Sequence, residues 1–231
     1  INPNNPTGVL YPRALLEEIL DIAREHDLVV FSDEIYDRLV MDGKEHISTA
    51  ALAPDLPVVT MNGLSKSHII CGFRCGWMVV SGMRGRADDF INGIVSLASM
   101  RLCGNALTQL VIPAALADEA STKAMLVPGG RLYEQREVTV RELRKIPGVS
   151  VVKNDATFYI FPKLDIKRFH ITNDEQFAMD FLHEKHVMIV PGRGFGWAQP
   201  DHFRIVMLPE PGRLKKAVHD LGDFLATYRQ A

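Results

Sequence analysis

The chain has 231 residues, a formal net charge of −2 at pH 7, 47% hydrophobic residues and 23% charged residues. This composition is typical of a folded globular protein and excludes a disordered one. A charge this close to zero gives no electrostatic reason to expect nucleic acid or an anionic membrane as a partner. No apolar run approaches the roughly 20 residues that span a bilayer. The three cysteines lack a C-x-x-C spacing, so we expect a reduced, cytoplasmic setting and no metal site.

The first part of the chain alternates short apolar runs with helical patterns. Residues 28–31 and 58–61 are typical of strands buried on both faces, and residues 77–80 of a further strand. A helix is expected to begin near Pro12, a suitable residue for a first turn. The expected apolar stripe of this helix is formed by Leu15, Ile19, Ile22 and Ala23. The alternation predicts an α/β fold with a mostly parallel sheet and helices on both faces.

The second part of the chain has a different pattern. Residues 86–118 are mostly helical and would link the two parts, and residues 130–146 predict a long helix. The remainder is typical of a compact α+β domain that ends in a helix over residues 213–228. Its strand candidates are residues 149–153, 157–161, 187–190 and 203–208. We therefore expect two domains, residues 1–118 and residues 119–231.

Polar side chains gather where the predicted strands of the first part end. Asp33 and Tyr36 follow the first predicted strand, and Lys66 follows the second. Asn5 lies in the segment NPNNPTG, where two prolines restrict the backbone and stiffen the loop. Ligands of open α/β sheets bind beyond the carboxyl ends of the strands. We therefore expect these four side chains to converge on one crevice.

Lys66 and Arg74 indicate a particular chemistry. A lysine that follows a small polar residue, here Ser65, can form a Schiff base with an aldehyde when its amine is uncharged. Arg74 follows eight residues later between glycine-containing dipeptides, and its planar guanidinium can hold two phosphate oxygens at once. Together they favour Schiff-base chemistry beside a phosphate. The structural alternatives are a turn for Asp33, a solvated lysine and ion-paired arginines.

The motifs NPNNPTG, SDEIY, NGLSK and GFRCGW resemble, in order and spacing, those of the class I and II aminotransferases of the fold-type I pyridoxal-phosphate family. The resemblance covers the whole chain. Together with NGLSK, residues 97–103 and 128–136 make it most similar to the bacterial alanine (glutamate–pyruvate) aminotransferases. It implies part of a pyridoxal-phosphate-binding large domain, whose last strand is antiparallel, followed by a small α+β domain. It also implies a C-terminal fragment that lacks the N-terminal part and is inactive by itself.

The resemblance implies a role for each residue that matches a family motif. Lys66 would form the internal aldimine with pyridoxal 5′-phosphate and then move the proton at the substrate α-carbon. Asp33 would pair with the pyridinium nitrogen and keep it protonated, so that the ring accepts carbanion charge. Tyr36 and Asn5 would hydrogen-bond the phenolic oxygen of the ring. These residues would form the catalytic half of the site.

Arginines would hold the anionic groups of cofactor and substrate. The resemblance implies that Arg74 binds the cofactor phosphate and that Arg204 binds the α-carboxylate of the substrate. A charge-assisted pair of the latter kind contributes about 1.5–3 kcal/mol. One departure from the family pattern is Gly63, where many relatives carry a hydroxyl residue that donates to the phosphate. Ser65 or a backbone amide would have to take over that role.

The function implied by the resemblance is transamination between an amino acid, alanine or glutamate, and a 2-oxo acid. It would follow a ping-pong mechanism in a protein that forms a homodimer when complete. Two alternatives remain from the sequence. One is a carbon–sulfur lyase or another fold-type I enzyme, which differs mainly in the residues of the substrate pocket. The other is the effector domain of an aminotransferase-like transcription regulator, which would carry a DNA-binding domain upstream.

Overall fold

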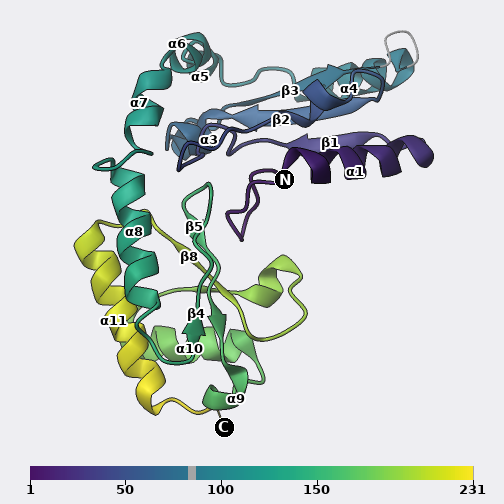
Figure 1. The fold of residues 1–231 in the computed structure, drawn as a ribbon. Coiled ribbons are helices and arrows are strands. Elements are labelled where there is room, and N and C mark those ends of the chain that lie inside the picture. Colours follow the sequence, from purple (N-terminus) through teal and green to yellow (C-terminus); the bar gives the residue numbers. More distant parts are fainter. Residues whose placement is uncertain (83–86, 231) are drawn as a thin grey trace. The chain divides into compact units, whose positions relative to one another are not determined.

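The computed structural model describes residues 1–82 and 87–230, and its ribbon is drawn in Figure 1. The chain divides into two compact units, each of which is described by itself. The first unit comprises Ile1–Asn4 and Val9–Ala124, and the second comprises Asn5–Gly8 and Met125–Ala231. The short loop that contains Asn5 therefore belongs with the C-terminal half of the sequence. No helix among the described residues combines the length and the apolar character needed to cross a membrane.

The first unit is built on a three-stranded sheet. Its strands, in spatial order, are β1 (Val30–Asp33), β2 (Val58–Gly63) and β3 (Gly76–Ser81). β1 and β2 run parallel, and Asp33 lies opposite Met61 at the end of their ladder. β2 and β3 run antiparallel, and Gly63 lies opposite Gly76. The three strands expected from the sequence are confirmed, as is the antiparallel direction of the last; β1 begins two residues later than predicted. The prediction that β1 is buried on both faces is wrong, because Phe31 is 59% exposed.

The helices of the first unit follow the strands or connect them. They are α1 (Arg13–Glu25), α2 (Thr49–Leu52), α3 (Leu64–Ser67), α4 (Asp88–Arg101), α5 (Ala106–Gln109), α6 (Ile112–Ala117) and α7 (Glu119–Ala124), with a 3₁₀ turn, η1, at Cys71–Phe73. The N-terminal helix was expected and is confirmed, beginning at Arg13 just after Pro12. A small core forms where Leu20 and Ala23 of α1 meet Ala53 and Val58. This core fixes α1 against α2 and the start of β2.

The apolar stripe predicted for α1 is wrong on three of its four positions. Leu15, Ile19 and Ile22 are exposed, whereas the buried face of the helix is formed by Leu16, Leu20 and Ala23. The helix carries apolar residues on two faces, so spacing alone does not tell which face packs against the core. Tertiary packing decides between the faces, and here it selects the one that contains Leu20.

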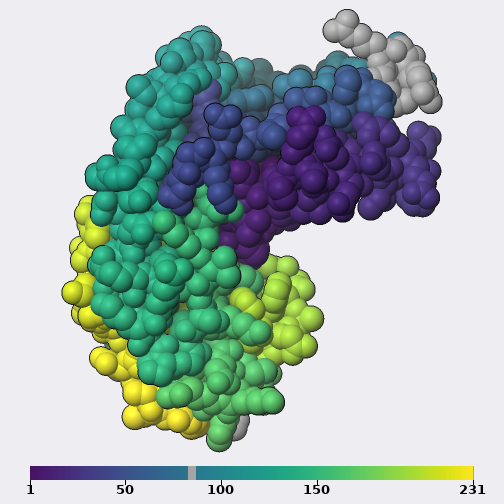
Figure 2. All heavy atoms as spheres, in the orientation of Figure 1, coloured from purple at the N-terminus to yellow at the C-terminus, as the bar shows by residue number. Residues whose placement is uncertain are grey.

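The second unit combines helices with two small antiparallel sheets, which confirms the expected α+β architecture. Its elements are α8 (Arg131–Leu143), β4 (Val149–Ser150), β5 (Tyr159–Ile160), β6 (Lys163–Leu164), α9 (Ile166–Phe169), α10 (Asp174–Lys185), β7 (Val190–Pro191), the 3₁₀ turn η2 (Gly192–Phe195), β8 (Phe203–Val206) and α11 (Pro211–Thr227). One sheet has the order β5-β8-β7, and the other pairs β4 with β6. α8 and α11 pack side by side (Figures 1 and 2). Three of the four strand candidates contain a strand that is shorter than predicted, whereas the candidate at residues 187–190 overlaps β7 only at Val190.

Aromatic rings form the centre of the second unit. The ring of Phe177 lies 6.0 Å from those of Phe203 and Phe224, and Phe181 lies 5.3 Å from Phe224. These four side chains are almost fully buried, and side chains of this size dominate the energetics of a core. The stripe on the last helix consists of Leu214, Val218, Leu221 and Leu225, all buried. This core anchors α10, β8 and α11 to one another.

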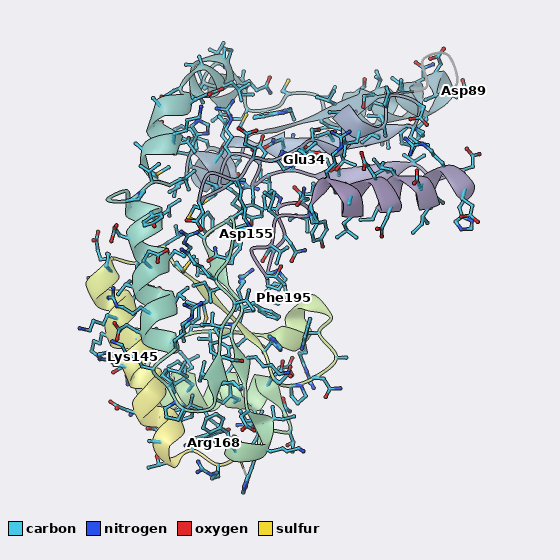
Figure 3. All side chains as sticks on the ribbon, viewed as in Figure 1. Glu34, Asp89, Lys145, Asp155, Arg168 and Phe195 are labelled. Atoms are coloured by element: carbon cyan, nitrogen blue, oxygen red, sulfur yellow. The ribbon has the colours of Figure 1, made fainter. Side chains whose placement is uncertain are left out.

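Glu142 on α8 accepts hydrogen bonds from three side chains. Lys145 lies 2.7 Å, Arg141 3.0 Å and His219 3.1 Å from its carboxylate, and Figure 3 labels Lys145. Their hydrogen bonds lower the pKa of the Glu142 carboxyl from its usual 4.5 to about 2, with that from Lys145 the largest. Because this pKa is depressed in the folded state, the carboxylate stabilises the fold above pH 4.5. That contribution is lost as the pH falls towards about 2.

We expect the substitution Glu142→Gln to lower the melting temperature at neutral pH. The difference in melting temperature between the variant and the wild-type protein should become smaller as the pH falls. The amide keeps the shape of the side chain but removes the negative charge to which Lys145 and Arg141 bind. Thermal melts of both proteins from neutral pH down to about pH 2 check this expectation. Glu184→Gln is the matched control, because the side chain of Glu184 is 55% exposed and its ion pair is with the neighbouring surface residue Lys185. A deficit that stays constant down to about pH 2 would contradict the assigned role.

Candidate active site

The predicted catalytic residues of the first unit lie at one edge of its sheet. Asp33 is the last residue of β1, and Lys66 lies on α3, a single helical turn that follows β2 directly. Tyr36 lies in the turn that follows Asp33 and is only 2% exposed. Since β1 and β2 are parallel, their carboxyl ends meet at the same edge, which is where α/β sheets bind ligands. The structure therefore brings these three residues to the expected place.

The carboxylate of Asp33 is partly committed to its own turn. Its Oδ1 accepts a hydrogen bond from the backbone N–H of Ile35 at 3.1 Å, and its carbonyl accepts one from Asn2 at 3.0 Å. These contacts fix the aspartate in an Asx turn. Its Oδ2 has no hydrogen-bond partner within the described parts of the chain. Asp33 is half-buried, and its Oδ2 is suited to accept a hydrogen bond from a protonated, positively charged nitrogen.

Arg74 lies in the left-handed backbone region, with φ 52°, at the end of η1. Its Nη1 donates to the carbonyl oxygen of Cys71 at 2.9 Å, which holds the side chain near the loop. No carboxylate of the described residues forms an ion pair with this guanidinium, so its remaining donors are open to an external anion. Ser65 is half-buried on α3 beside Lys66. The phosphate role of both residues stays a prediction.

Gly63 departs from the family pattern for a steric reason. It lies opposite Gly76, and a Cβ atom placed on Gly63 would be 2.8 Å from the carbonyl oxygen of Cys75 and 3.0 Å from the Cα of Gly76. Both neighbouring atoms belong to the backbone and cannot turn aside as a side chain can. The close approach of β2 and β3 therefore leaves no room for a hydroxyl residue at this position.

Arg204 is the centre of the candidate site in the second unit. Its Nη1 donates to Oδ1 of Asn5 at 2.8 Å. The guanidinium carbon lies 4.4 Å from the ring centre of Tyr159 and 4.8 Å from that of Phe195, a residue labelled in Figure 3. Its Nε is buried without a hydrogen-bond partner, and no carboxylate in the described part of the chain pairs with it. The arginine is therefore held in place but keeps a buried donor for an anion.

The contact with Arg204 also orients Asn5. Because the guanidinium can only donate, the amide oxygen of Asn5 faces it, and the amide nitrogen of Asn5 is left as a donor on the other side. The sequence did not predict this contact, nor the rings of Tyr159 and Phe195 near the arginine. The structure thus gives two groups, one at the edge of the first sheet and one around Arg204. Their convergence on one crevice stays a prediction.

Comparisons with known proteins agree with this arrangement. The family model for aminotransferase class I and II matches residues 1–221. The chain is 48% identical over 230 residues to the glutamate-pyruvate aminotransferase AlaA of Haemophilus influenzae and 45% identical to an alanine aminotransferase of Mycobacterium bovis. Both matches include 100% of this chain, but only 57% and 54% of the length of these relatives. The chain thus spans little more than half the length of the curated relatives it matches.

Solved structures give the same result. A crystal structure of an aminotransferase from Escherichia coli superimposes with a TM-score of 0.97 at 48% identity, covering 100% of this chain and 57% of the other. An alanine aminotransferase from Pyrococcus furiosus gives a TM-score of 0.88 at 40% identity, covering 97% of this chain and 56% of the other. The chain belongs to the class I and II aminotransferases, and its fold is part of the fold-type I architecture.

The cofactor of this family is pyridoxal 5′-phosphate, and the residues present fit its chemistry. Asp33 offers an unpartnered carboxylate oxygen to a positive ring nitrogen, and the guanidinium of Arg74 offers donors to a phosphate. Lys66 supplies a primary amine from the same sheet edge as Asp33. The donors and acceptors of the first unit thus match the charges of the cofactor. This agreement rests on the donor set and not on the motif alone.

Proposed function

We propose that the complete protein transfers an amino group between an amino acid and a 2-oxo acid, in a ping-pong sequence. The observation that carries this proposal is the state of Arg204, which is held by Asn5 and two rings while its Nε is buried and unpartnered. Amino acids and 2-oxo acids share a carboxylate next to the reacting carbon. A planar guanidinium binds such a group in a fixed orientation, which is the requirement for a site that accepts both.

The residues of this chain would divide the work as follows. Bound pyridoxal phosphate supplies an electron sink for the charge that develops at the substrate α-carbon. The amine of Lys66 would remove the proton from the α-carbon of the amino acid in the first half of the reaction and deliver a proton to the corresponding carbon of the 2-oxo acid in the second half. Asp33 holds the ring nitrogen in its protonated form through Oδ2, and the hydroxyl of Tyr36 and the amide nitrogen of Asn5 donate to the phenolic oxygen. We assign the phosphate to Arg74, with Ser65 beside it in place of the missing hydroxyl at position 63.

The substrates we propose are alanine and glutamate with their 2-oxo acids, because curated relatives carry these names. Incubation of the whole protein with alanine, 2-oxoglutarate and pyridoxal phosphate should release pyruvate and glutamate in equal amounts. Ammonia released without any 2-oxo acid would instead favour a lyase. We also propose a homodimer in the cytoplasm, where the three free cysteines would stay reduced.

We expect the substitution Arg204→Lys to raise the KM for both the amino acid and the 2-oxo acid by roughly 10–100-fold. A lysine keeps the charge but loses the planar set of donors, and a bidentate charge-assisted pair contributes about 1.5–3 kcal/mol. Steady-state kinetics with each substrate varied in turn measures the change. Arg168→Lys is the matched control, because Arg168 also lies over an aromatic ring, that of Phe169 at 5.9 Å. An unchanged KM in the Arg204 variant would exclude the carboxylate role.

A further inference from the structure

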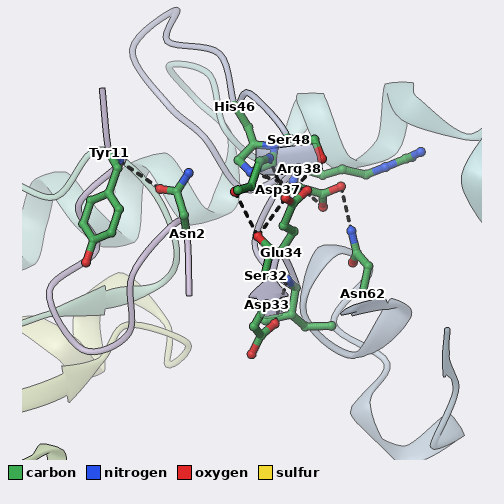
Figure 4. A network of polar contacts seen from close by, with 12 residues as sticks. Asn2, Tyr11, Ser32, Asp33, Glu34, Asp37, Arg38, His46, Ser48 and Asn62 are labelled. Atoms are coloured by element: carbon green, nitrogen blue, oxygen red, sulfur yellow. Dashed lines mark hydrogen bonds and ion pairs between the residues drawn. The ribbon is translucent and has the colours of Figure 1, made fainter. Parts of the chain in front are cut away.

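Asn62 joins the two segments that carry Tyr36 and Lys66. Its side-chain Nδ2 donates to Oδ2 of Asp37 at 2.9 Å (Figure 4). Its Oδ1 accepts a hydrogen bond from the backbone N–H of Gly63 at 2.7 Å. Asp37 is the residue directly after Tyr36, and Asn62 lies four residues before Lys66. One side chain therefore holds both the turn of the tyrosine and the start of the lysine helix.

Asp37 is well placed to act as the fixed partner. Its Oδ1 accepts the backbone N–H of Arg38 at 2.7 Å, so both carboxylate oxygens are engaged. Nη2 of Arg38 in turn donates to the carbonyl oxygen of Leu116 at 3.1 Å, which connects this turn to α6. Burial raises the pKa of the Asp37 carboxyl, partly offset by the hydrogen bond from Asn62. A carboxylate held by several donors in a desolvated place moves little.

The hydrogen bond between Asn62 and Asp37 lies just past the point where backbone pairing between β1 and β2 ends. Their ladder ends at Asp33 and Met61, with one further hydrogen bond from the N–H of Glu34 to the carbonyl of Met61 at 2.9 Å. Beyond it the chain after β1 turns away at residues 35–38, whereas β2 continues through Asn62 and Gly63, which pair with Trp77 and Gly76 of β3. α3 has a single turn, and a helix of this length is not stable by itself in water. The side-chain contact between Asn62 and Asp37 continues the link past the end of the ladder.

We propose that Asp37 and Asn62 form a positioning pair, which fixes the Tyr36 hydroxyl relative to the Lys66 amine so that both reach the same cofactor. This inference rests on the proposed function, since it assigns Tyr36 and Lys66 to pyridoxal phosphate. Neither member of the pair touches the reacting atoms. They act through the backbone segments that they join, and they deepen the site without adding a catalytic residue.

An exchange of the two side chains tests the pair. Asp37→Asn alone removes the acceptor that faces Asn62 or the one that faces the N–H of Arg38, and Asn62→Asp alone sets two carboxylates against each other. In the double variant, the amide at position 37 donates to the carboxylate at position 62, so the direction of this hydrogen bond is reversed. The backbone N–H groups of Arg38 and Gly63 keep their acceptors. Asn62→Ser, which is too short to reach Asp37, is a milder single variant. Each is made in the whole protein.

Two readouts are measured for each variant: the pH midpoint at which the absorbance of the bound cofactor changes, and the rate of borohydride trapping at Lys66. The melting temperature without cofactor is measured for the same variants. A hydrogen-bond donor to the phenolic oxygen favours the proton-free form of the cofactor. Loss of the hydrogen bond between Asn62 and Asp37 would misplace Tyr36, which is such a donor, and should raise the titration midpoint by about 0.5–1 pH unit. The exchanged double variant should return towards the wild-type midpoint. Trapping at Lys66 should become slower in the single variants and recover in the double variant.

A matched control comes from the same buried network. Oε1 of Glu34 accepts hydrogen bonds from Ser32, Ser48 and the N–H of Thr49, and these tie β1 to α2 (Figure 4). Ser48→Ala removes one of them at 3.1 Å and should lower the melting temperature without moving the titration midpoint.

If the single variants of the pair behave like Ser48→Ala, the pair is only structural and the proposal is overturned. If the wild-type protein gives no adduct at Lys66, the proposed function itself fails, and the positioning role fails with it.

Discussion

Replacement of Lys66 by alanine is expected to abolish the covalent attachment of pyridoxal phosphate and to lower amino-group transfer by roughly 10²–10⁴-fold or more. Lys66 lies on the single turn that follows β2, at the sheet edge where β1 ends with Asp33. No other residue that we assign to the site can both bond an aldehyde and move a proton at the α-carbon. Borohydride reduction of the loaded whole protein, followed by peptide mapping and a transfer assay, measures both losses.

Lys123→Ala serves as the control for this experiment. Its side chain is 74% exposed and its amine pairs with Glu119 at 2.8 Å, so it represents an ordinary surface lysine of the same unit. We expect this variant to retain the adduct at Lys66 and full transfer activity. An adduct that persists in Lys66→Ala, or one scattered over surface lysines in the wild-type protein, would remove Lys66 from the site. Added small amines that restore part of the transfer would support its role as the base.

The sequence predicted the parts of this site that depend on local order. Asp33 and Lys66 follow apolar runs that are strands in the structure, and chain direction alone places the ends of parallel strands at one edge. Gly63 could be recognised as a departure from the family but not explained. Its explanation requires the register of β2 and β3, which sets it opposite Gly76.

Contacts between residues distant in sequence could not be predicted. Asn5 and Arg204 are 199 positions apart, and nothing in either segment specifies that their side chains meet. The same holds for Asn62 and Asp37, whose hydrogen bond depends on how the turn after β1 lies against the end of β2. The α1 stripe fails for a related reason, since Leu20 is selected by the core it meets and not by helical period. In each case, tertiary packing decides among arrangements that local pattern leaves equal.

The substitution Gly63→Ser is expected to weaken the protein, although it introduces the hydroxyl that the resemblance places in many relatives. Its Cβ would lie 2.8 Å from the carbonyl oxygen of Cys75 and 3.0 Å from the Cα of Gly76, so β2 and β3 would have to separate. Forcing extra volume into a packed position costs about 1–3 kcal/mol. The backbone of Gly63 is extended, with φ 176°, so this cost comes from the contact and not from backbone strain.

The separation of β2 and β3 would also move the segments next to these strands that carry Lys66 and Arg74. Lys66 follows β2 by a few residues and Arg74 precedes β3, so we expect Gly63→Ser to bind pyridoxal phosphate more weakly despite its added donor. Thermal melts without cofactor and a cofactor titration measure the two effects separately. Gly72→Ser is the matched control, because a Cβ there meets nothing within 4 Å. Tighter binding in Gly63→Ser with an unchanged melting temperature would mean that the strands can open to admit a hydroxyl. The phosphate role would then no longer need Ser65.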